Sequence, residues 1–332
     1  MKRYILYLLP IPVLVLSVFI GPSGAVDSRQ ILIWLAKTIF SYHQDARIND
    51  TLIRAIIWDV RIPRILLAFL VGGALSSSGN ALQSMFRNPL VCPYILGLSS
   101  GAAFGAALAL ATSRIPVQLS AFVFGILAVG ISFFLARTKK SVSVVTMVLS
   151  GIVVSGIFTA LLTIVQFMTD PFKLQTIVHW TMGNLHHAGW EKLRSSSLPI
   201  IAGMIGMFLL RWRMNVLSLG DDETRAVGLN PEIEKILILI PATLAASASV
   251  AAAGVIGLVG LVIPHTIRMM IGPDNTHSLP ICFTFGGSFL LIVDNFSRTI
   301  ASFEIPIGIF TTLIGGPFFI FLLKRLKVGW DI

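Results

Sequence analysis

The side chains that could bind a metal or catalyse a reaction are few and far apart in this sequence. His186 and His187 stand together between residues 168 and 194, where a metal site is the alternative to a solvated loop. The pair has no evident third ligand, which favours the loop. Cys92 and Cys282 lie in or beside apolar runs without CxxC spacing, which is typical of buried free thiols. We therefore predict no metal and no cofactor in this chain, with the histidine pair left open.

Catalytic motifs are also missing from the sequence. It contains no HExxH, and no GxSxG in a strand–turn–helix context. No lysine follows a glycine, so the chain has no Walker A sequence. We expect a protein that is not an enzyme, and we expect another polypeptide to bind any ATP and Mg²⁺ that drive its work.

The composition indicates that the elements carrying these residues lie in a membrane. Of the 332 residues, 55% are hydrophobic and only 12% are charged, whereas a soluble domain has about 25% charged residues. The formal charge is nevertheless +10. In a membrane chain, such a surplus indicates anchoring residues at the lipid surface and an acidic partner rather than nucleic acid.

Ten stretches are long and apolar enough to predict membrane-spanning helices. They lie near residues 4–20, 62–86, 94–112, 116–136, 142–167, 196–212, 235–253, 255–271, 279–300 and 306–323. The first stretch also resembles a secretory signal, because basic residues precede it and Ser23-Gly24-Ala25 follows it. We expect a retained helix, since nine further spans follow it.

The basic residues predict the orientation of these spans. With the N-terminus inside, 14 of the 25 Lys and Arg residues lie on the inner side. Six of the remaining 11 fall in or just after one long external segment, residues 21–60. Because short loops rich in Lys and Arg face the cytoplasm, and the span number is even, we predict that both termini are cytoplasmic.

Charged groups within the predicted spans are rare. Asp294 is the only carboxylate, and Arg298 lies four residues later, so a paired structural role is as plausible as a functional one. Secondary transporters usually carry ionisable groups at mid-membrane, so this scarcity argues against ion-coupled transport, which is kept as an alternative. Two seams of small residues predict close helix packing, with a mobile helix seam as the functional alternative: Gly97, Gly101 and Gly105, and Ala245, Ser249 and Ala253.

Four stretches of the chain carry a specific resemblance. They are Arg61-Ile62-Pro63-Arg64 continuing through Asn88-Pro89 to Gly101-Ala102, then residues 219–230, residues 254–268, and residues 304–319. In this order they closely resemble the FecCD-type permease subunits of ABC importers for iron chelates, haem and cobalamin. The likeness covers about residues 55–325.

This resemblance implies an all-α polytopic membrane protein with the type II ABC importer permease fold, as a single domain over residues 1–332. It implies about ten transmembrane helices, with an internal pseudo-two-fold repeat that relates the second to fifth spans with the seventh to tenth. The implied partners are a second permease copy in a homodimer, two ATP-binding subunits inside, and a periplasmic or lipid-anchored binding protein outside. The implied location is the cell inner membrane.

The segment 218–235 is predicted to form two short cytoplasmic helices. Ser218 and Asp221 have capping-box spacing, Gly228 suits a helix C-terminus, and Asn230-Pro231 suits the start of another helix. In the resembling family such helices couple the permease to a cleft in the ATPase. The coupling residues implied here are Gly220, Asp221, Asp222, Glu223, Arg225, Ala226, Gly228 and Leu229.

Two further sites follow from the resemblance. Arginines at the external span ends are implied to receive acidic residues of the binding protein, although each could be a snorkelling anchor: they are Arg61, Arg64 and Arg298. The fifth span is the candidate pathway helix, with ordinary packing as its alternative: its small and polar residues are Ser150, Gly151, Ser155, Gly156 and Thr159.

The predicted function is therefore ATP-driven import of a chelate through a permease that contains no chemistry. A ferric siderophore is the first expectation for the cargo, and haem, cobalamin and molybdate are the alternatives. An ion-coupled secondary transporter and a non-transporting membrane assembly or sensor protein are the alternatives from other classes.

Overall fold

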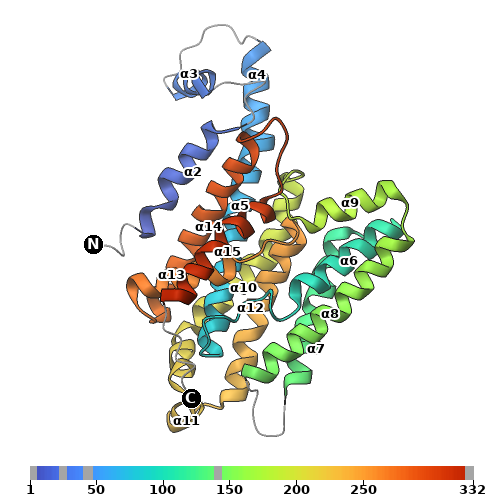
Figure 1. Ribbon diagram of the computed structural model, residues 1–332. Helices are drawn as coiled ribbons and strands as arrows, with labels where there is room; N and C mark the ends of the chain where they lie inside the picture. Colours follow the sequence, from blue (N-terminus) through green and yellow to red (C-terminus); the bar gives the residue numbers. More distant parts are fainter. Residues whose placement is uncertain (1–5, 22–27, 40–47, 138–143, 326–332) are drawn as a thin grey trace.

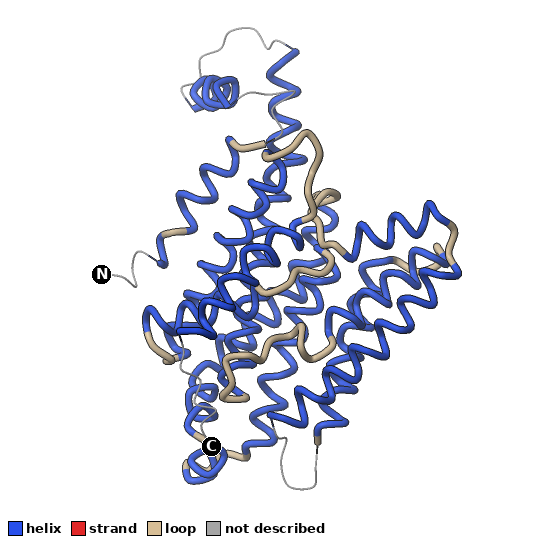
Figure 2. The backbone as a smooth tube through the Cα atoms, viewed as in Figure 1, coloured by secondary structure: helices blue, strands red, loops and turns tan. Residues whose placement is uncertain are grey.

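The computed structural model describes residues 6–21, 28–39, 48–137 and 144–325. Within these ranges the chain forms helices joined by loops, without a strand (Figure 2). The elements are α2 (Pro10–Phe19), α3 (Ser28–Ile39), α4 (Ile48–Ala55), the π-helical η1 (Ile56–Arg61), α5 (Ile62–Met85), α6 (Leu98–Thr112), α7 (Val117–Ala136), α8 (Val144–Met168), α9 (Pro171–Thr181), α10 (Trp190–Leu219), α11 (Asp221–Ala226), α12 (Pro231–Ala253), α13 (Val259–Ile271), α14 (Asn275–Thr299) and α15 (Ile307–Arg325).

Each of the ten predicted spans corresponds to a helix of the structure. Five helices, α7, α8, α10, α12 and α14, are long and apolar enough to cross a membrane by length and composition. Four shorter apolar helices accompany them among the described residues: Leu6–Phe19, which includes α2, then α6, α13, and Ile307–Phe318 of α15. Basic residues used for the orientation at positions 2, 3, 47, 139, 140 and 327, and part of the 21–60 segment, lie outside the described residues.

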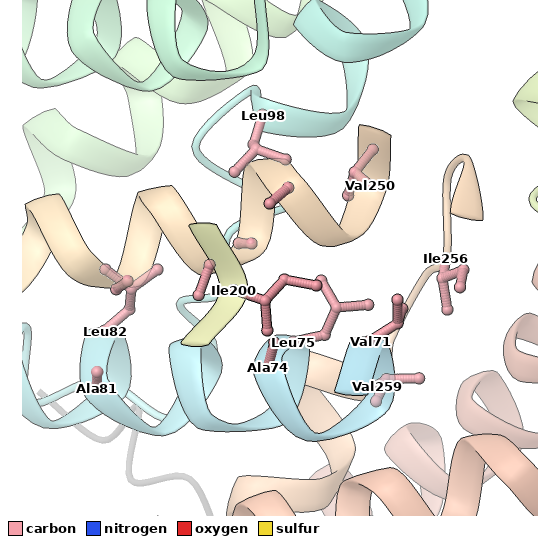
Figure 3. Packing of buried hydrophobic residues seen from close by; sticks show 14 of the residues in the cluster. Val71, Ala74, Leu75, Ala81, Leu82, Leu98, Ile200, Val250, Ile256 and Val259 are labelled. Carbon is pink, nitrogen blue, oxygen red and sulfur yellow. The ribbon is translucent and has the colours of Figure 1, made fainter. Parts of the chain in front are cut away.

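Helix α5 is the centre of the bundle. It packs against α14, α12, α10 and α13, and every residue from Val71 to Phe86 is buried. Polar side chains are buried there with the apolar ones, which explains why α5 is less apolar than the outer helices. In Figure 3, Val71 and Leu75 of α5 lie close to Ile200 of α10 and to α12, where Val250 is labelled. The core is thus formed by helices from both halves of the chain.

Paired glycines allow α5 and α14 to cross closely. A Cβ atom on Gly72 would clash with the backbone of Gly286, and one on Gly286 would clash with Ser76. The neighbouring glycines show the same reciprocal contact: a Cβ atom on Gly73 would clash with the Phe283 ring, and one on Gly287 would clash with the Phe69 ring. The two aromatic rings also touch edge to face, with centroids 5.5 Å apart. Close backbone approach of this kind is how helices associate within lipid.

The two halves of the bundle share an order of elements that fits the predicted repeat. In one half, the long α5 is followed by an extended loop and the short α6; in the other, α12 is followed by a loop and the short α13. The residue immediately before each short helix has a left-handed backbone, Gly97 with φ 85° and Leu258 with φ 64°. Each short helix is then followed by two longer helices.

The two ends of the bundle carry different additions. Helices α3 and α4 project at one end, whereas α11 lies at the opposite end (Figure 1). Ile31, Ile53 and Ile57 form a small hydrophobic cluster of their own at the α3–α4 end. Helix α2 packs along α14, where Asn295 Nδ2 donates to Ser17 Oγ at 2.7 Å. The predicted external segment and the predicted coupling segment therefore lie on opposite sides.

Candidate functional site

The coupling segment forms the short helix α11, which follows α10 after a sharp turn at Gly220. Gly220 has φ 153° and ψ 167°, a conformation that disfavours other residues, and a Cβ atom there would run into the Glu223 side chain. Thr224 is buried, and its Oγ1 donates to the Gly220 carbonyl at 2.5 Å. Gly228, with φ 82°, follows the end of α11 as predicted. These contacts fix the direction in which α11 leaves the bundle.

Two details of the predicted coupling segment were wrong. Ser218 does not cap α11, because α10 continues to Leu219 and the Ser218 hydroxyl donates to the Asn215 carbonyl at 2.7 Å. Asn230 and Pro231 do begin a helix, and Asn230 Oδ1 accepts from the Glu232 amide at 3.0 Å. That helix is the 23-residue α12 rather than a second short one. The coupling segment is therefore continuous with a core helix.

Ion pairs anchor α11 to the bundle. Asp221 turns inward, and its Oδ2 lies 2.8 Å from Nζ of Lys235, whose side chain is 4% exposed. Asp221 Oδ1 lies 3.5 Å from Arg87 Nη2 at the end of α5. A neighbouring pair, Arg213 and Glu234 at 2.6 Å, joins α10 to α12. Asp221 thus ties α11 to both α5 and α12, which makes it an anchor rather than part of the outer face.

Arg87, Lys235, Arg213 and Glu234 were missed as parts of this site. Arg87 has φ 51°, a left-handed conformation that costs a non-glycine residue about 1 kcal/mol. Such residues persist where the surroundings hold them, often at functional sites. The Arg87-Asn88-Pro89 stretch was part of the sequence resemblance, so its position was a signal, but its partner Asp221 lies far along the chain and was not readable.

The outer face of α11 combines charges with apolar side chains. Asp222, Glu223 and Arg225 are exposed, and Arg225 Nη1 pairs with Asp222 Oδ1 at 3.0 Å. Val227 and Leu219 flank them with 58% and 69% of their surface exposed. The predicted residues Ala226 and Gly228 are exposed too, and Leu229 is half-buried. A mixed charged and apolar face at the end of a bundle suits contact with another protein.

The predicted docking arginines form an internal charge cluster at the other end of the bundle. Arg64 Nη2 lies 2.8 Å from Asp294 Oδ1, and its Nη1 lies 2.8 Å from Glu304 Oε1. Arg298 Nε lies 3.1 Å from the second oxygen of Asp294. Asp294 is completely buried, so one carboxylate neutralises two buried guanidinium groups.

The arginines predicted to receive a partner at the external span ends are buried rather than exposed. Arg61, Arg64 and Arg298 are only 4–5% exposed, and Arg61 Nη1 donates to the Val18 carbonyl at 2.6 Å. The Asp294–Arg298 pair expected from the sequence is present, and Arg64 and Glu304 enlarge it. The arginines are therefore already paired within the chain.

Glu304 is the accessible member of this cluster. It lies in the loop between α14 and α15, its side chain is 27% exposed, and its Oε2 lies 3.1 Å from His186 Nδ1. Partial burial alone would raise the pKa of Glu304, but the hydrogen bonds from Arg64 and His186 lower it below the usual value. His186 also packs edge to face on His187. In the described part of the chain, no three His, Cys, Asp or Glu side chains form a group that could hold a metal.

The candidate pathway helix α8 lies at the edge of the bundle. Gly156 and Thr159 are exposed, and Ser150 and Ser155 are half-buried. Gly151 is different, because a Cβ atom there would clash with the Ile95 carbonyl in the loop before α6. The structure therefore divides the five predicted residues between packing at Gly151 and an open face at Gly156 and Thr159.

A cavity of about 530 Å³ lies between the loop before α13 and the start of α15. Its lining is mostly apolar, and Thr181 and Thr312 are among the lining residues. Tyr94, from the loop against which α8 packs, completes one wall. Leu258, the left-handed residue before α13, completes another. The cavity thus depends on the position of α13.

A comparison with family models identifies this arrangement. The model of the FecCD transport family matches residues 8–325, which include both charge clusters, the cavity and α11. The chain belongs to the FecCD transport family. This confirms the resemblance expected from the sequence, and the chain is a multi-pass membrane permease of the ABC importer class.

Similar proteins carry several cargo names. A probable iron chelatin transport system permease protein of Helicobacter pylori is 36% identical, with 94% of each chain covered. The molybdate import system permease protein MolB of Haemophilus influenzae is 38% identical over 84% of each chain. A solved structure of a proposed metal-chelate type ABC transporter, in an inward-facing conformation, is 34% identical with a TM-score of 0.83, covering 98% of this chain and 99% of that one. The relatives named for different cargoes are thus similar in sequence to this chain over most of its length.

Proposed function

We propose that this FecCD-family chain is the membrane subunit of an ATP-driven importer that moves an iron chelate, a ferric siderophore, into the cytoplasm. The observation that carries this proposal is the construction of α11. Asp221 ties it to the two central helices, while its charged outer face stays free at the end of the bundle opposite α3 and α4. A helix that is firmly held inside and open outside is suited to receive a mechanical input from a partner.

The proposed assembly contains a homodimer of this chain, two ATP-binding subunits at α11, and a periplasmic or lipid-anchored binding protein at the opposite end. It lies in the inner membrane with both termini in the cytoplasm. The ATPase subunits bind ATP and Mg²⁺, and this chain needs no cofactor of its own. The open face of α8, with Gly156 and Thr159, borders the proposed pathway between the two copies.

Closure of the ATPase subunits is proposed to displace α11. Because Asp221 joins α11 to Lys235 and Arg87, the displacement reaches α12 and α5 together. The loop after α12 and the loop after α5 both contribute to the cavity, through Leu258 and Tyr94. Movement of these two helices would therefore change the cavity from both walls, which links ATP use to passage of the cargo.

The binding protein is proposed to reach the arginine cluster by exchange. Arg64 is already paired, but one of its partners is the partly exposed Glu304. An acidic residue of the binding protein can replace Glu304 on Arg64, because a guanidinium group donates two hydrogen bonds to any carboxylate in the same bidentate geometry. Arg298 and Arg61 support this exchange by holding Asp294 and the end of α2 in place.

The cargo class rests on the apolar cavity and the names of the relatives. Iron chelatin in one relative and molybdate in another leave several cargoes to compare. The mostly apolar lining of the cavity favours a bulky chelate over a small oxyanion, which would require hydrogen-bond donors. Haem and cobalamin, which are also bulky, are the next candidates.

The test is reconstitution in liposomes with the cognate ATPase and binding protein. ATP enclosed in the liposome lumen, which corresponds to the cytoplasm, should drive uptake of radiolabelled ferric siderophore. The uptake rates of haem, cobalamin and molybdate are measured for comparison. A partner ATPase that cannot hydrolyse ATP should abolish uptake, and a protonophore should leave it unchanged. Uptake that survives the inactive ATPase but collapses with the protonophore would identify an ion-coupled transporter.

A further inference from the structure

A buried polar network joins four helices in the α11 half of the bundle. Its members are Asn80 and Ser84 of α5, Asn215 of α10, Arg268 of α13, and Asn275 of α14. Asn80 and Asn275 are completely inaccessible, and Ser84 is 3% exposed. Polar side chains at such positions need partners, and the structure supplies them within the network.

Asn275 is the centre of the network. Its Oδ1 accepts from Asn80 Nδ2 at 2.8 Å and from Ser84 Oγ at 2.7 Å. Its backbone N–H and its Nδ2 both donate to Asn215 Oδ1, at 2.7 and 2.9 Å. One residue at the start of α14 therefore holds α5 and α10 at once.

Arg268 attaches α13 to the same network. Its Nη2 donates to the Asn80 carbonyl at 2.8 Å and to Ser84 Oγ at 2.9 Å. None of the ion pairs among the described residues includes Arg268, and its buried Nε has no hydrogen-bond partner. Its charge is thus held by neutral oxygens of α5 alone, which makes α13 dependent on the position of Asn80 and Ser84.

One end of the network reaches the coupling segment. Asn215 lies in the last turns of α10, shortly before the turn at Gly220, and the Ser218 hydroxyl bonds its carbonyl at 2.7 Å. Asn215 Nδ2 also donates at 2.7 Å to Asp274, which caps α14. A movement of α11 that shifts the end of α10 therefore acts on the start of α14 through Asn215.

The other end of the network reaches the cavity. Arg268 is in α13, and the residue before α13 is Leu258, which lines the cavity. The same helix is locked against α5, because a Cβ atom on Gly79 would fall on the Gly260 carbonyl. Because α5 and α13 are so closely packed here, a displacement of α5 toward α13 pushes directly on the backbone of α13, next to Leu258.

We propose that this network is a relay that transmits movement of α11 to the cavity through α10, α14, α5 and α13. Its members are positioning residues, which touch neither the ATPase face nor the cargo cavity. The inference rests on the proposed role of α11 as the point of ATPase contact. It adds a second route, because the Asp221 anchor acts on α12 and α5 directly whereas the network controls α13.

The experiment places a fluorescent reporter at the cavity of the complex with its cognate ATPase in lipid nanodiscs. Tyr94 is 54% exposed and lines the cavity, so Tyr94→Cys accepts an environment-sensitive label, while the native Cys92 and Cys282 are buried. Vanadate trapping of the ATPase should change the fluorescence. Ser84→Ala is then introduced beside the matched control Ser249→Ala, which removes a buried hydroxyl bonded only to a carbonyl of its own helix.

We expect Ser84→Ala to reduce the trapping-induced fluorescence change about twofold while ATP hydrolysis continues, because the Asp221 anchor still moves α5 and α12, and we expect Ser249→Ala to keep the full change. Asn275→Ala should behave as Ser84→Ala, and combining the two should add little, because both break one route. Equal responses of Ser84→Ala and Ser249→Ala, or the absence of any fluorescence change on trapping in the parent complex, would overturn the relay. No cargo is used, so failure of the uptake experiment to find a chelate is a separate result.

Discussion

Substitution of Asp294 by Asn removes the charge that neutralises the arginine cluster while keeping the size of the side chain. Asp294 is completely buried, and its two oxygens face Arg64 at 2.8 Å and Arg298 at 3.1 Å. The neutral amide of the Asp294→Asn variant would leave Arg64 with Glu304, and Arg298 with the neutral Asn295 Oδ1. The cluster would then hold two buried guanidinium groups against a single, partly exposed carboxylate.

The size of the effect follows from this loss of neutralisation. Removing one partner of a buried ion pair costs about 3–5 kcal/mol, because the remaining charge stays buried. Glu304 keeps part of the compensation for Arg64, so we expect the lower end, about 3 kcal/mol. That is more than about a hundredfold in the unfolding equilibrium, since each 1.4 kcal/mol is about tenfold.

The assay is equilibrium unfolding of the purified protein in mixed micelles, followed by helical circular dichroism as sodium dodecyl sulfate is added. Asp222→Asn is the matched control, because Asp222 also pairs with an arginine, at 3.0 Å, but its side chain is 93% exposed. We expect its free energy of unfolding to change by less than about 1 kcal/mol. If Asp294→Asn and Asp222→Asn unfold at the same detergent fraction, the buried cluster does not stabilise the bundle and our reasoning is refuted.

Three further results are expected. The pKa of Glu304 is lowered in the folded protein, so its pairing with Arg64 should stabilise the fold fully at neutral pH. This stability should be lost as the pH falls below the ordinary carboxyl value near 4.5. Thermal unfolding of the wild type and of Glu304→Gln across this pH range measures the loss. Gly79→Ala should destabilise by about 2–3 kcal/mol, because its Cβ meets the α13 backbone, as detergent unfolding would reveal. Lys235→Met should lower ATPase binding to α11 severalfold, since Asp221 loses its 2.8 Å partner, as measured by co-purification.

Each of these results has its own control. Gly130→Ala serves for Gly79, because nothing lies within 4 Å of a Cβ atom at Gly130; equal stability of the two variants contradicts the close crossing. The losses of ATPase binding caused by Asp221→Asn and Lys235→Met should not add in full, because both variants break the same ion pair; losses that add in full would show that Asp221 does not act through Lys235. A Glu304→Gln profile that still falls with the wild-type curve would assign the acid sensitivity to another group.

Hydropathy predicted the spans well because each membrane helix must satisfy its own backbone and present apolar side chains. It placed the ends less well. The predicted span 196–212 became α10, residues 190–219, since polar and charged residues on either side, such as Lys192 and Arg213, extend the helix without adding hydropathy. The span 94–112 became the shorter α6, because Gly97 turns the chain with φ 85°. Helices α3, α4 and α9 were missed altogether, as short helices with many polar residues fall outside a search for long apolar runs.

The sequence also predicted where the site residues lie along the bundle better than it predicted their contacts. Position along the chain was enough to assign α11 to one end of the bundle, and the arginines to η1, the start of α5 and the end of α14. It did not give the inward turn of Asp221 or the burial of Arg64, because their partners Lys235 and Glu304 are brought in by tertiary packing, the latter from 240 residues away. Local spacing at Ser218 even suggested a cap that the continuing helix α10 removes.

The buried polar face of α5 has a consequence for how the protein is made. Ser78 bonds the Ala242 carbonyl and Asn80 bonds Asn275, across separations of 164 and 195 residues. Synthesis proceeds from the N-terminus, so α5 enters the bilayer long before α12 and α14 exist. Until then, these polar groups of α5 lie in lipid or beside the insertion machinery without their final hydrogen-bond partners. A chain interrupted before α12 would leave them permanently without these partners. Completion of the C-terminal half is thus the step that commits the nascent N-terminal half to its place in the membrane.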